Sequence, residues 1–421
     1  MTIPARIPFP VVDEVSRHCL QEEEPETVHI EVHLPGPLDP ARMRKAFTEA
    51  LRRHPRILMR EAAGGWYRRR YEWELTAEPD VEVVSFPSPG RNALRDARTR
   101  ALAEAPPLSL SPPIRLEVVE EAHSTTVLFL TINHTALDGP ACLRILATAA
   151  EIYGGRDNSP TPAPIRPPDP PQSTDTPSNW TRPARVAPGT PEASPGNGLL
   201  VTELPLPHRP KGSPYTVNDQ LMVTTALTIA HWNREHGQSP RPLRITMPVD
   251  DRPRDMTMPI GNGTRLVEVP FSPTELTRTP GDMPDLLRRT AQRTRALKSL
   301  TRPPLGHGAG LLTAPVTPVT WRAALTRGLR RAAAPWTSTT LLSNIGRIPY
   351  PLDFGEEAGR AHAVWFSAPA RMPRGLTVTT ASTGGRLHLA LRWSRTLLGH
   401  GDGHHLRDLF EHYLHTTEAA P

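Results

Sequence analysis

Residues 131–139 read Thr-Ile-Asn-His-Thr-Ala-Leu-Asp-Gly and directly follow the apolar run Val-Leu-Phe-Leu at 127–130. This pattern predicts a strand whose carboxyl end delivers His134 to a turn. An imidazole held there in one tautomer can accept a proton from an attacking amine or alcohol. Asp138 can fold back to organise the turn, and Gly139 allows a tight backbone before an apolar helix over 140–153. The alternative is a structural histidine followed by an Asp that only caps the helix.

Hydrophobic periodicity on both sides of this stretch predicts a mixed α/β chain. Strands are expected at 28–34, 66–75, 114–119, 126–132, 199–206, 243–249, 264–269, 339–344, 376–382 and 387–394. Helices are expected at 40–54, 92–105, 140–153, 218–236, 283–300, 316–334 and 403–416. The dipeptide Gly384-Gly385 is a good hairpin turn between the last two strands.

The composition limits the class of protein. A chain of 421 residues is long enough for two halves, each with its own core. Its 49 basic and 43 acidic residues give a net charge of +6, but no basic run carries interleaved aromatic residues, so no nucleic acid partner is expected. We find neither a secretory signal nor an apolar run near the roughly 18 residues that span a bilayer. These features predict a cytoplasmic protein with no membrane partner.

Cysteine, histidine and proline usage adds three expectations. Cys19 and Cys142 form neither a disulfide framework nor a metal spacing, and Cys142 is expected in the core of its helix. His400, His404 and His405 are interpreted as a solvated turn, so no metal is expected. Residues 159–195 hold twelve prolines and predict a mobile connector, with proteolysis first near Arg166, Arg182 or Arg185.

Residues 134–139 resemble the His-x-x-x-Asp-Gly signature of the condensation-domain superfamily. This group includes the condensation domains of nonribosomal peptide synthetases, their free-standing relatives and chloramphenicol acetyltransferase-like acyltransferases. Flanking segments resemble the family in order and spacing, and together they cover nearly the whole chain outside the connector. They are 38–55, which ends in Arg-His-Pro; 112–116, Pro-Pro-Ile-Arg-Leu; 216–221, Thr-Val-Asn-Asp-Gln-Leu; 247–253, Met-Pro-Val-Asp-Asp-Arg-Pro, with Gly261-Asn262; and 342–347, Leu-Ser-Asn-Ile-Gly-Arg.

The resemblance implies an α/β fold of the α+β type. Two chloramphenicol-acetyltransferase-like subdomains would form a V with a tunnel between them. The first, residues 1–155, would carry the motif; residues 156–197 would be a proline-rich linker; residues 198–421 would form the second subdomain.

The resemblance also assigns roles to individual residues. His134 would be the general base, or would position the substrate and stabilise a tetrahedral intermediate. Asp138 would hold the loop by pairing with an arginine, for which Arg252 is the preferred partner and Arg254 the rival. The N–H of Gly139 would lie near the developing oxyanion.

Three further residues are oxyanion or tunnel candidates. Ser343 and Asn344 lie on the strand that the resemblance places near the tunnel, although a strand-end turn would explain them equally well. Asn133 stands where many condensation domains carry the first of two histidines. This departure weakens any assignment as a standard peptide-bond-forming condensation domain.

The implied activity is that of an acyltransferase or free-standing condensation enzyme in secondary-metabolite biosynthesis. The donor would be a phosphopantetheine or coenzyme A thioester, and the acceptor a small-molecule amine or alcohol. We expect no permanently bound cofactor, an acyl or peptidyl carrier protein acting in trans, and a monomer. The alternative is a repurposed condensation fold that cyclises or isomerises a bound intermediate, or recruits a partner enzyme to a carrier protein.

Overall fold

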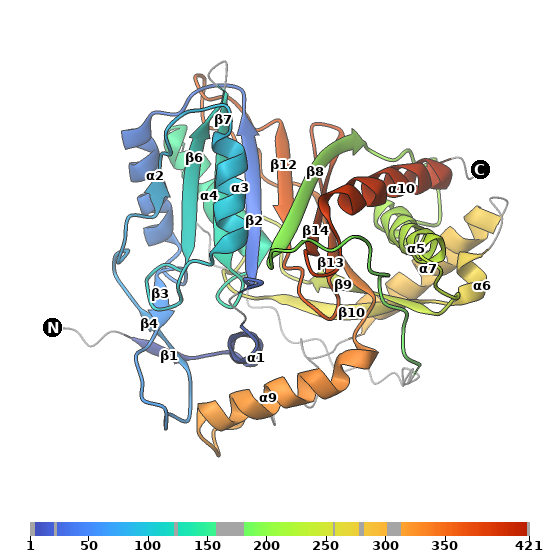
Figure 1. The fold of residues 1–421 in the computed structure, drawn as a ribbon. Coiled ribbons are helices and arrows are strands. Elements are labelled where there is room, and N and C mark those ends of the chain that lie inside the picture. Colours follow the sequence, from blue (N-terminus) through green and yellow to red (C-terminus); the bar gives the residue numbers. More distant parts are fainter. Residues whose placement is uncertain are drawn as a thin grey trace.

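The computed structural model describes residues 5–20, 23–121, 125–156, 181–255, 257–277, 282–300 and 313–418. Figure 1 shows two α/β halves side by side, each with helices packed on a central sheet. Within the described ranges, no helix combines the length and apolar character needed to cross a bilayer.

The first half is built on a five-stranded sheet of order β12-β2-β7-β6-β5. Its strands are β2 (Thr27–Leu34), β5 (Val84–Ser85), β6 (Ile114–Glu120), β7 (Thr126–Asn133) and β12 (Ala363–Ser367). Its helices are α2 (Pro40–Arg53), α3 (Ala93–Ala103) and α4 (Gly139–Tyr153). Helices α2 and α4 pack together over the main core, whereas α3 covers the opposite face. The buried strand β7 therefore runs through the middle of this half and ends at the motif.

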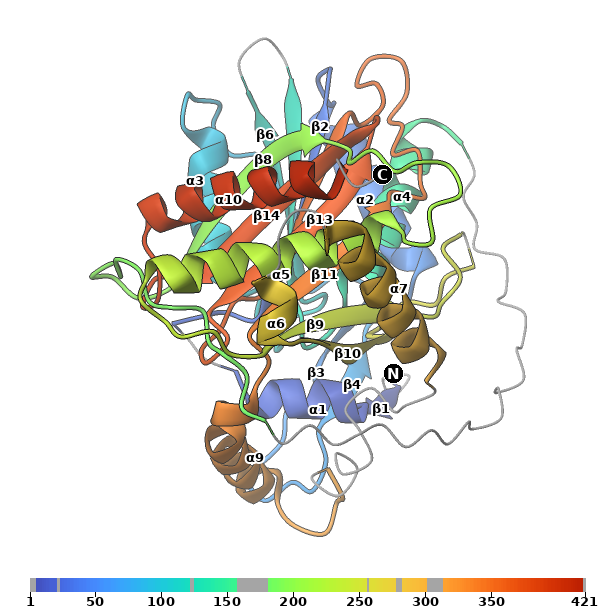
Figure 2. The same ribbon diagram turned by 90° about the vertical axis from the view of Figure 1, so that its right-hand side faces the viewer.

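The second half is built on a six-stranded sheet of order β10-β9-β11-β13-β14-β8. Its strands are β8 (Asn197–Pro205), β9 (Leu243–Asp250), β10 (Thr264–Phe271), β11 (Thr340–Arg347), β13 (Leu376–Thr383) and β14 (Arg386–Ser394). Its helices are α5 (Val217–Glu235), α6 (Pro273–Leu276), α7 (Met283–Ser299) and α10 (His400–Glu418). Helices α5, α7 and α10 contact one another, and Figure 2 shows them stacked over the same sheet.

A third layer lies below both sheets in Figure 1. It contains β1 (Arg6–Pro8), β3 (Met59–Glu61) and β4 (Glu72–Leu75) in a sheet of order β1-β4-β3. Helix α1 (Val11–His18) packs against α9 (Val319–Ala333), which the short helix η3 (Ala334–Trp336) follows. In both views α9 lies at the lower edge of the molecule, away from the two large sheets.

One strand of the second half completes the sheet of the first. Strand β12 pairs antiparallel with β2 and is an edge strand of that sheet. The Arg392 guanidinium adds a second link, since it donates to the carbonyl oxygens of Pro25 and Thr27 at 3.1 and 2.7 Å. The division at 1–155, 156–197 and 198–421 stays a prediction. The structure adds that one strand from residues 198–421, β12, belongs to the sheet of the first half.

Most of the expected elements are present within a few residues, with two differences. Residues 66–71 lie outside strand β4, because Trp66 and Tyr67 are exposed on a loop and have no strand beside them. The last helix begins at His400 and not at residue 403. The histidines of the interpreted turn therefore lie on its first turns, where His400 and His404 are hydrogen-bonded at 3.1 Å.

The prediction of a mobile connector is wrong for residues 181–195. Residues 157–180, including Arg166, lie outside the described part of the chain. From residue 181 the backbone packs on the second half, where Val186 and Ala187 are both 2% exposed. Ala187 N–H donates to Asn233 at 2.8 Å, and the Ala187 carbonyl accepts from Trp232 at 2.9 Å. These few apolar residues bury their side chains despite the surrounding prolines, so early cleavage at Arg185 is not expected.

Candidate active site

A cavity of about 420 Å³ lies between the two halves. Its wall comes from α1, the loop after β7, the start of α4, strands β9, β10 and β11, and residues 366–374. His134, Asp138, Gly139, Ser343 and Asn344 all line it. The fold therefore gathers the candidate residues of the motif and those of β11 around one space.

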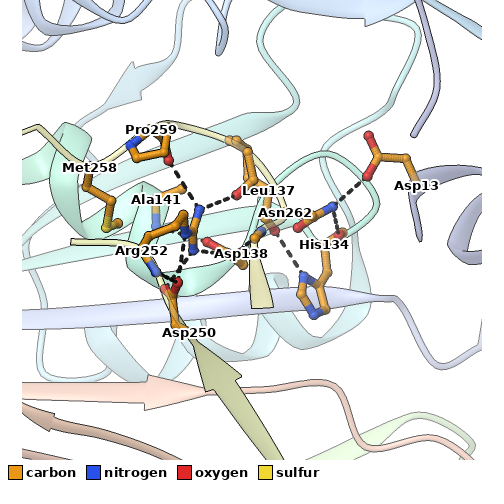
Figure 3. Close-up of polar contacts among 12 residues, drawn as sticks. Asp13, His134, Leu137, Asp138, Ala141, Asp250, Arg252, Met258, Pro259 and Asn262 are labelled. Carbon is orange, nitrogen blue, oxygen red and sulfur yellow. Dashed lines mark hydrogen bonds and ion pairs between the residues drawn. The ribbon is translucent and has the colours of Figure 1, made fainter. Parts of the chain in front are cut away.

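His134 sits directly after β7 and is held in one orientation. Its backbone N–H donates to the Glu26 carbonyl at 2.8 Å, which fixes the loop against the start of β2. Its Nδ1 lies 3.0 Å from the Leu137 carbonyl oxygen, and a dashed line marks this contact in Figure 3. A carbonyl only accepts, so Nδ1 carries a hydrogen, and in the neutral imidazole the free lone pair belongs to Nε2. No described residue is hydrogen-bonded to Nε2, which leaves it available as a base in the cavity.

Asp138 combines a helix cap with an ion pair. Its Oδ1 accepts from the Ala141 N–H at 3.0 Å and so caps α4. Its Oδ2 accepts from the Arg252 guanidinium at 2.6 Å and from the Gly263 N–H at 2.9 Å. The predicted pair between Asp138 and Arg252 is therefore present, and it joins the first half to the second.

Arg252 has more partners than the resemblance implied. Asp250 accepts from it at 2.8 and 2.9 Å, and the carbonyls of Pro259 and Gly261 accept at 3.2 and 2.9 Å. Burial acts to lower the pKa of Arg252, but the hydrogen bonds and charges of Asp250 and Asp138 outweigh it and raise the pKa. The guanidinium is thus a fixed cation shared by two carboxylates (Figure 3).

Asn262 clamps the histidine loop from the second half. Its Nδ2 donates to the carbonyls of His134 and Thr135 at 3.3 and 3.0 Å, and to Asp13 Oδ1 at 2.9 Å. Trp73 donates to the other oxygen of Asp13 at 2.9 Å. Burial nevertheless raises the pKa of Asp13 to about 6, against the pull of these hydrogen bonds. Asn262 lies in one of the segments that resemble the condensation-domain superfamily, whereas no sequence motif marks Asp13.

Gly139 leaves room for neighbouring side chains and does not adopt an unusual backbone angle. The prediction that it allows a tight backbone is therefore corrected. Its φ does not lie in the left-handed region, unlike that of the glycines in the turns. A Cβ at this position would lie 3.3 Å from the Phe366 ring and 3.6 Å from Val28. A side chain here would push against β12 and β2.

Asn133 does not face the cavity. Its Nδ2 donates to the Pro106 carbonyl at 3.0 Å, and its Oδ1 accepts from the Thr135 N–H at 3.1 Å. The side chain is buried and is absent from the described residues that line the cavity. This placement disagrees with the prediction that Asn133 is a tunnel residue, because both of its polar atoms hold the backbone of the loop.

Ser343 and Asn344 differ in what they can offer. Asn344 Oδ1 accepts from Gly346 N–H at 2.9 Å and from the Thr380 hydroxyl at 3.1 Å. Its Nδ2 donates to Asn218 at 3.2 Å, so the amide mainly holds β11 in place. The Ser343 hydroxyl has no hydrogen-bond partner among the described residues, and it therefore remains free to donate.

Several arginines line the cavity, and they differ in their partners. Arg254, the rival partner for Asp138, instead donates to the Ile345 carbonyl at 2.8 Å. Arg371 forms an ion pair with Glu26. Arg330 and Arg374 also line the cavity, and no described carboxylate lies within ion-pair distance of either. Among the described residues the Arg374 side chain donates only to the hydroxyls of Ser338 and Thr246, and burial lowers its pKa to about 10.

The remaining candidate groups take no part in this site. Burial raises the pKa of the Cys142 thiol well above its usual value, because this residue of α4 lies in the hydrophobic core of the first half. Within the described ranges, no cluster of three or more His, Cys, Asp or Glu residues has the geometry to hold a metal ion.

Solved structures of similar shape include condensation domains of a polyketide synthase and of a synthetase. The condensation domain of the Monacolin K polyketide synthase MokA matches with a TM-score of 0.64 at 13% identity, over 98% of this chain and 97% of that one. The first condensation domain of the CDA synthetase matches with a TM-score of 0.64 at 15% identity, over 99% and 97%. This protein has the condensation-domain fold.

The same fold occurs in an acetyltransferase. The TRI3 trichothecene 15-O-acetyltransferase from Fusarium sporotrichioides matches with a TM-score of 0.66 at 11% identity, over 99% of this chain and 96% of that one. The predicted fold class is therefore confirmed.

Comparison of sequences adds relatives without an assigned activity. The uncharacterized protein Rv2305 of Mycobacterium tuberculosis (strain ATCC 25618 / H37Rv) is 28% identical over 390 residues, which cover 82% of this chain and 84% of the relative. The uncharacterized protein MT2362 of strain CDC 1551 / Oshkosh matches to the same extent. No protein-family model matches this chain.

Proposed function

We propose that this protein is an acyltransferase that moves an acyl group from a thioester to an amine or hydroxyl acceptor. One observation carries the proposal: His134 lines the cavity while its Nδ1 is committed to the Leu137 carbonyl, so Nε2 is the ring nitrogen left to accept a proton. Only this tautomer places a base in the cavity.

The chemistry needs one proton to travel through His134. As the acceptor nitrogen or oxygen attacks the thioester carbonyl, Nε2 takes its proton and a tetrahedral intermediate with an oxyanion forms. The Ser343 hydroxyl and the Gly139 N–H are the candidate donors to that oxyanion. When the carbon–sulfur bond breaks, the imidazolium returns the proton to the leaving thiolate. The products are an amide or ester and a free thiol.

The donor is proposed to carry phosphate, as a phosphopantetheine arm on a carrier protein in trans or as coenzyme A. Arg330 and Arg374 support this, because they line the cavity without a carboxylate partner in the described part of the chain. A guanidinium binds phosphate strongly through paired N–H groups. The acceptor is proposed to be a small-molecule amine or alcohol.

The test is acyl transfer measured by intact mass spectrometry, with acyl-carrier and acyl-coenzyme A donors offered to a set of amines and alcohols. His134→Ala is expected to lower turnover about 10²–10⁴-fold. His412→Ala, an exposed histidine on α10, is the matched control and is expected to keep full activity. Full activity of His134→Ala would refute the assignment. If wild type produces isomerised or cyclised donor and no transfer product, the alternative of a repurposed fold replaces the proposal.

A further inference from the structure

Helix α9 is amphipathic in the reverse of the usual sense. A surface helix normally buries its apolar stripe and exposes its polar one. The buried residues of α9 are Val319, Arg322, Ala323 and Thr326. Most of its exposed residues are apolar or small, and these are Trp321, Ala324, Leu325, Gly328, Leu329, Ala332 and Ala333; the other exposed residues are Thr320, Arg327 and Arg331.

Buried polar contacts hold α9 in this orientation. Arg322 on its inner side donates to Glu14 of α1 at 2.6 Å, and both side chains are almost fully buried. The hydroxyl of Thr326 lies 3.3 Å from Nδ1 of the buried His18. Turning the helix over would strip these groups of their partners, and buried polar groups without partners are costly. The exposure of the apolar stripe is therefore specified by the fold.

A neighbouring loop extends the apolar surface. Residues 62–71 connect β3 to β4, and Figure 1 shows this loop beside one end of α9. Val319 N–H donates to the Arg68 carbonyl at 2.9 Å, which joins the loop to the start of the helix. Trp66 and Tyr67 at its tip are 71% and 68% exposed, and Trp321 on the helix is 67% exposed. We call Trp66, Tyr67, Trp321, Leu325 and Leu329 the α9 face.

The surroundings of the α9 face are positively charged. The sequence contains no Asp or Glu between Asp285 and Asp353. Arg327 and Arg331 are exposed along one flank of the helix, and Arg69 and Arg70 are exposed on the loop. Exposed tryptophan and leucine side chains match a partner with an apolar interior, and the flanking arginines match an anionic surface on the same partner.

We propose that the α9 face docks this protein on an anionic lipid bilayer as an interfacial helix. Such helices lie in the membrane plane, with Trp and Leu buried among the acyl chains and Arg at the headgroups. The helix that carries this face lies at the edge of the molecule (Figures 1 and 2). A helix at the edge can contact a flat bilayer surface, whereas a recessed site could not. This proposal replaces the expectation from sequence that no membrane partner exists.

The position of α9 connects the bilayer with the cavity. Arg330 on the helix and Thr337 just after it line the cavity wall. A bilayer in contact with the α9 face would therefore lie beside the site, where it could supply or receive an acyl chain. Docking itself does not depend on the acyltransferase proposal.

The experiment is flotation of the full chain with vesicles of phosphatidylcholine alone and of phosphatidylcholine with about one third phosphatidylglycerol, an anionic fraction chosen to give a negative surface. Wild type is expected to float with the anionic vesicles, to bind the neutral ones much less, and to dissociate partly in high salt. Trp321→Glu/Leu325→Glu is expected to lose at least ten-fold in bound fraction. Leu206→Glu, another exposed apolar residue located directly after β8, is the matched control and is expected to bind like wild type.

Three results would overturn the proposal: wild type that does not float, a double variant that floats like wild type, and a control that fails equally. Sedimentation without lipid tests whether another protein covers the α9 face in place of a bilayer. If wild type is a dimer and the double variant a monomer, a second copy covers the face. If only an acidic carrier protein binds it, the surface is a protein interface. Circular dichroism of each variant shows that it is folded, and retained activity on a soluble donor would show that docking and catalysis are separable.

Discussion

Replacing Asp138 should destabilise the protein more than replacing His134, although both side chains lie in the same loop. Asp138→Ala removes the acceptor for the Ala141 and Gly263 N–H groups and one partner of Arg252. His134→Ala removes one hydrogen bond, from Nδ1 to the Leu137 carbonyl, at a partly buried position. The two variants therefore separate a residue that holds the loop from one that acts in the cavity.

The magnitudes follow from these contacts. Loss of a helix cap costs about 1 kcal/mol, and loss of a charged hydrogen bond costs about 1.5–3 kcal/mol. Asp138→Ala should therefore cost about 2.5–4 kcal/mol by these values, whereas His134→Ala should cost about 1 kcal/mol. Arg252 is not left alone, since Asp250 still binds it at 2.8 Å. Removing Asp138 and Asp250 together leaves a buried guanidinium without a carboxylate, so the double variant should lose more than the sum of the single variants.

Urea unfolding of wild type, both single variants at 138 and 250, and the double variant measures this directly. Equal stability of Asp138→Ala and wild type would refute the structural role, above all if acyl transfer were abolished at the same time. Additive losses in the double variant would show that the two carboxylates do not share one cation.

The remaining predictions concern catalysis, pH dependence and packing. His134→Ala should lower acyl transfer about 10²–10⁴-fold with an unchanged circular dichroism spectrum, and near-full transfer would exclude a role for its imidazole. Burial raises the pKa of Asp13 to about 6, so the folded state holds more protons than the unfolded state between pH 4 and 6. The stability of wild type relative to Asp13→Asn should thus fall by about 1.4 kcal/mol per pH unit across that window and then level off, and parallel pH profiles would contradict this. In Gly403→Ala the new Cβ would lie 2.4 Å from the Trp393 ring, so melting should show a loss of about 1–3 kcal/mol; a wild-type melting curve would mean that the ring can move aside.

Elements with a strong local pattern could be predicted from the sequence. The hairpin of β6 and β7 and the helix after it follow from alternation, from an Asp cap and from an apolar run. The edge strand β12 was missed, because five residues carry little periodic signal and their partner strand lies more than 300 residues away in the chain. The packed end of the connector was missed because its composition is dominated by proline, while three small apolar side chains decide its position.

The sequence by itself determined that His134 and Asp138 lie in one loop between a strand and a helix. The reason is local, since the cap of α4 and the bond from His134 to Leu137 each close within three residues. The family resemblance favoured Arg252, 114 residues away, over Arg254 as the partner of Asp138, and the tertiary structure decided between them. Only the tertiary structure showed that Asn262, held by Asp13, clamps the histidine loop. The tertiary structure likewise decided that α9 turns its leucines outward. Such contacts depend on how two sheets and a third layer pack, and no pattern within a few residues of the chain carries that information.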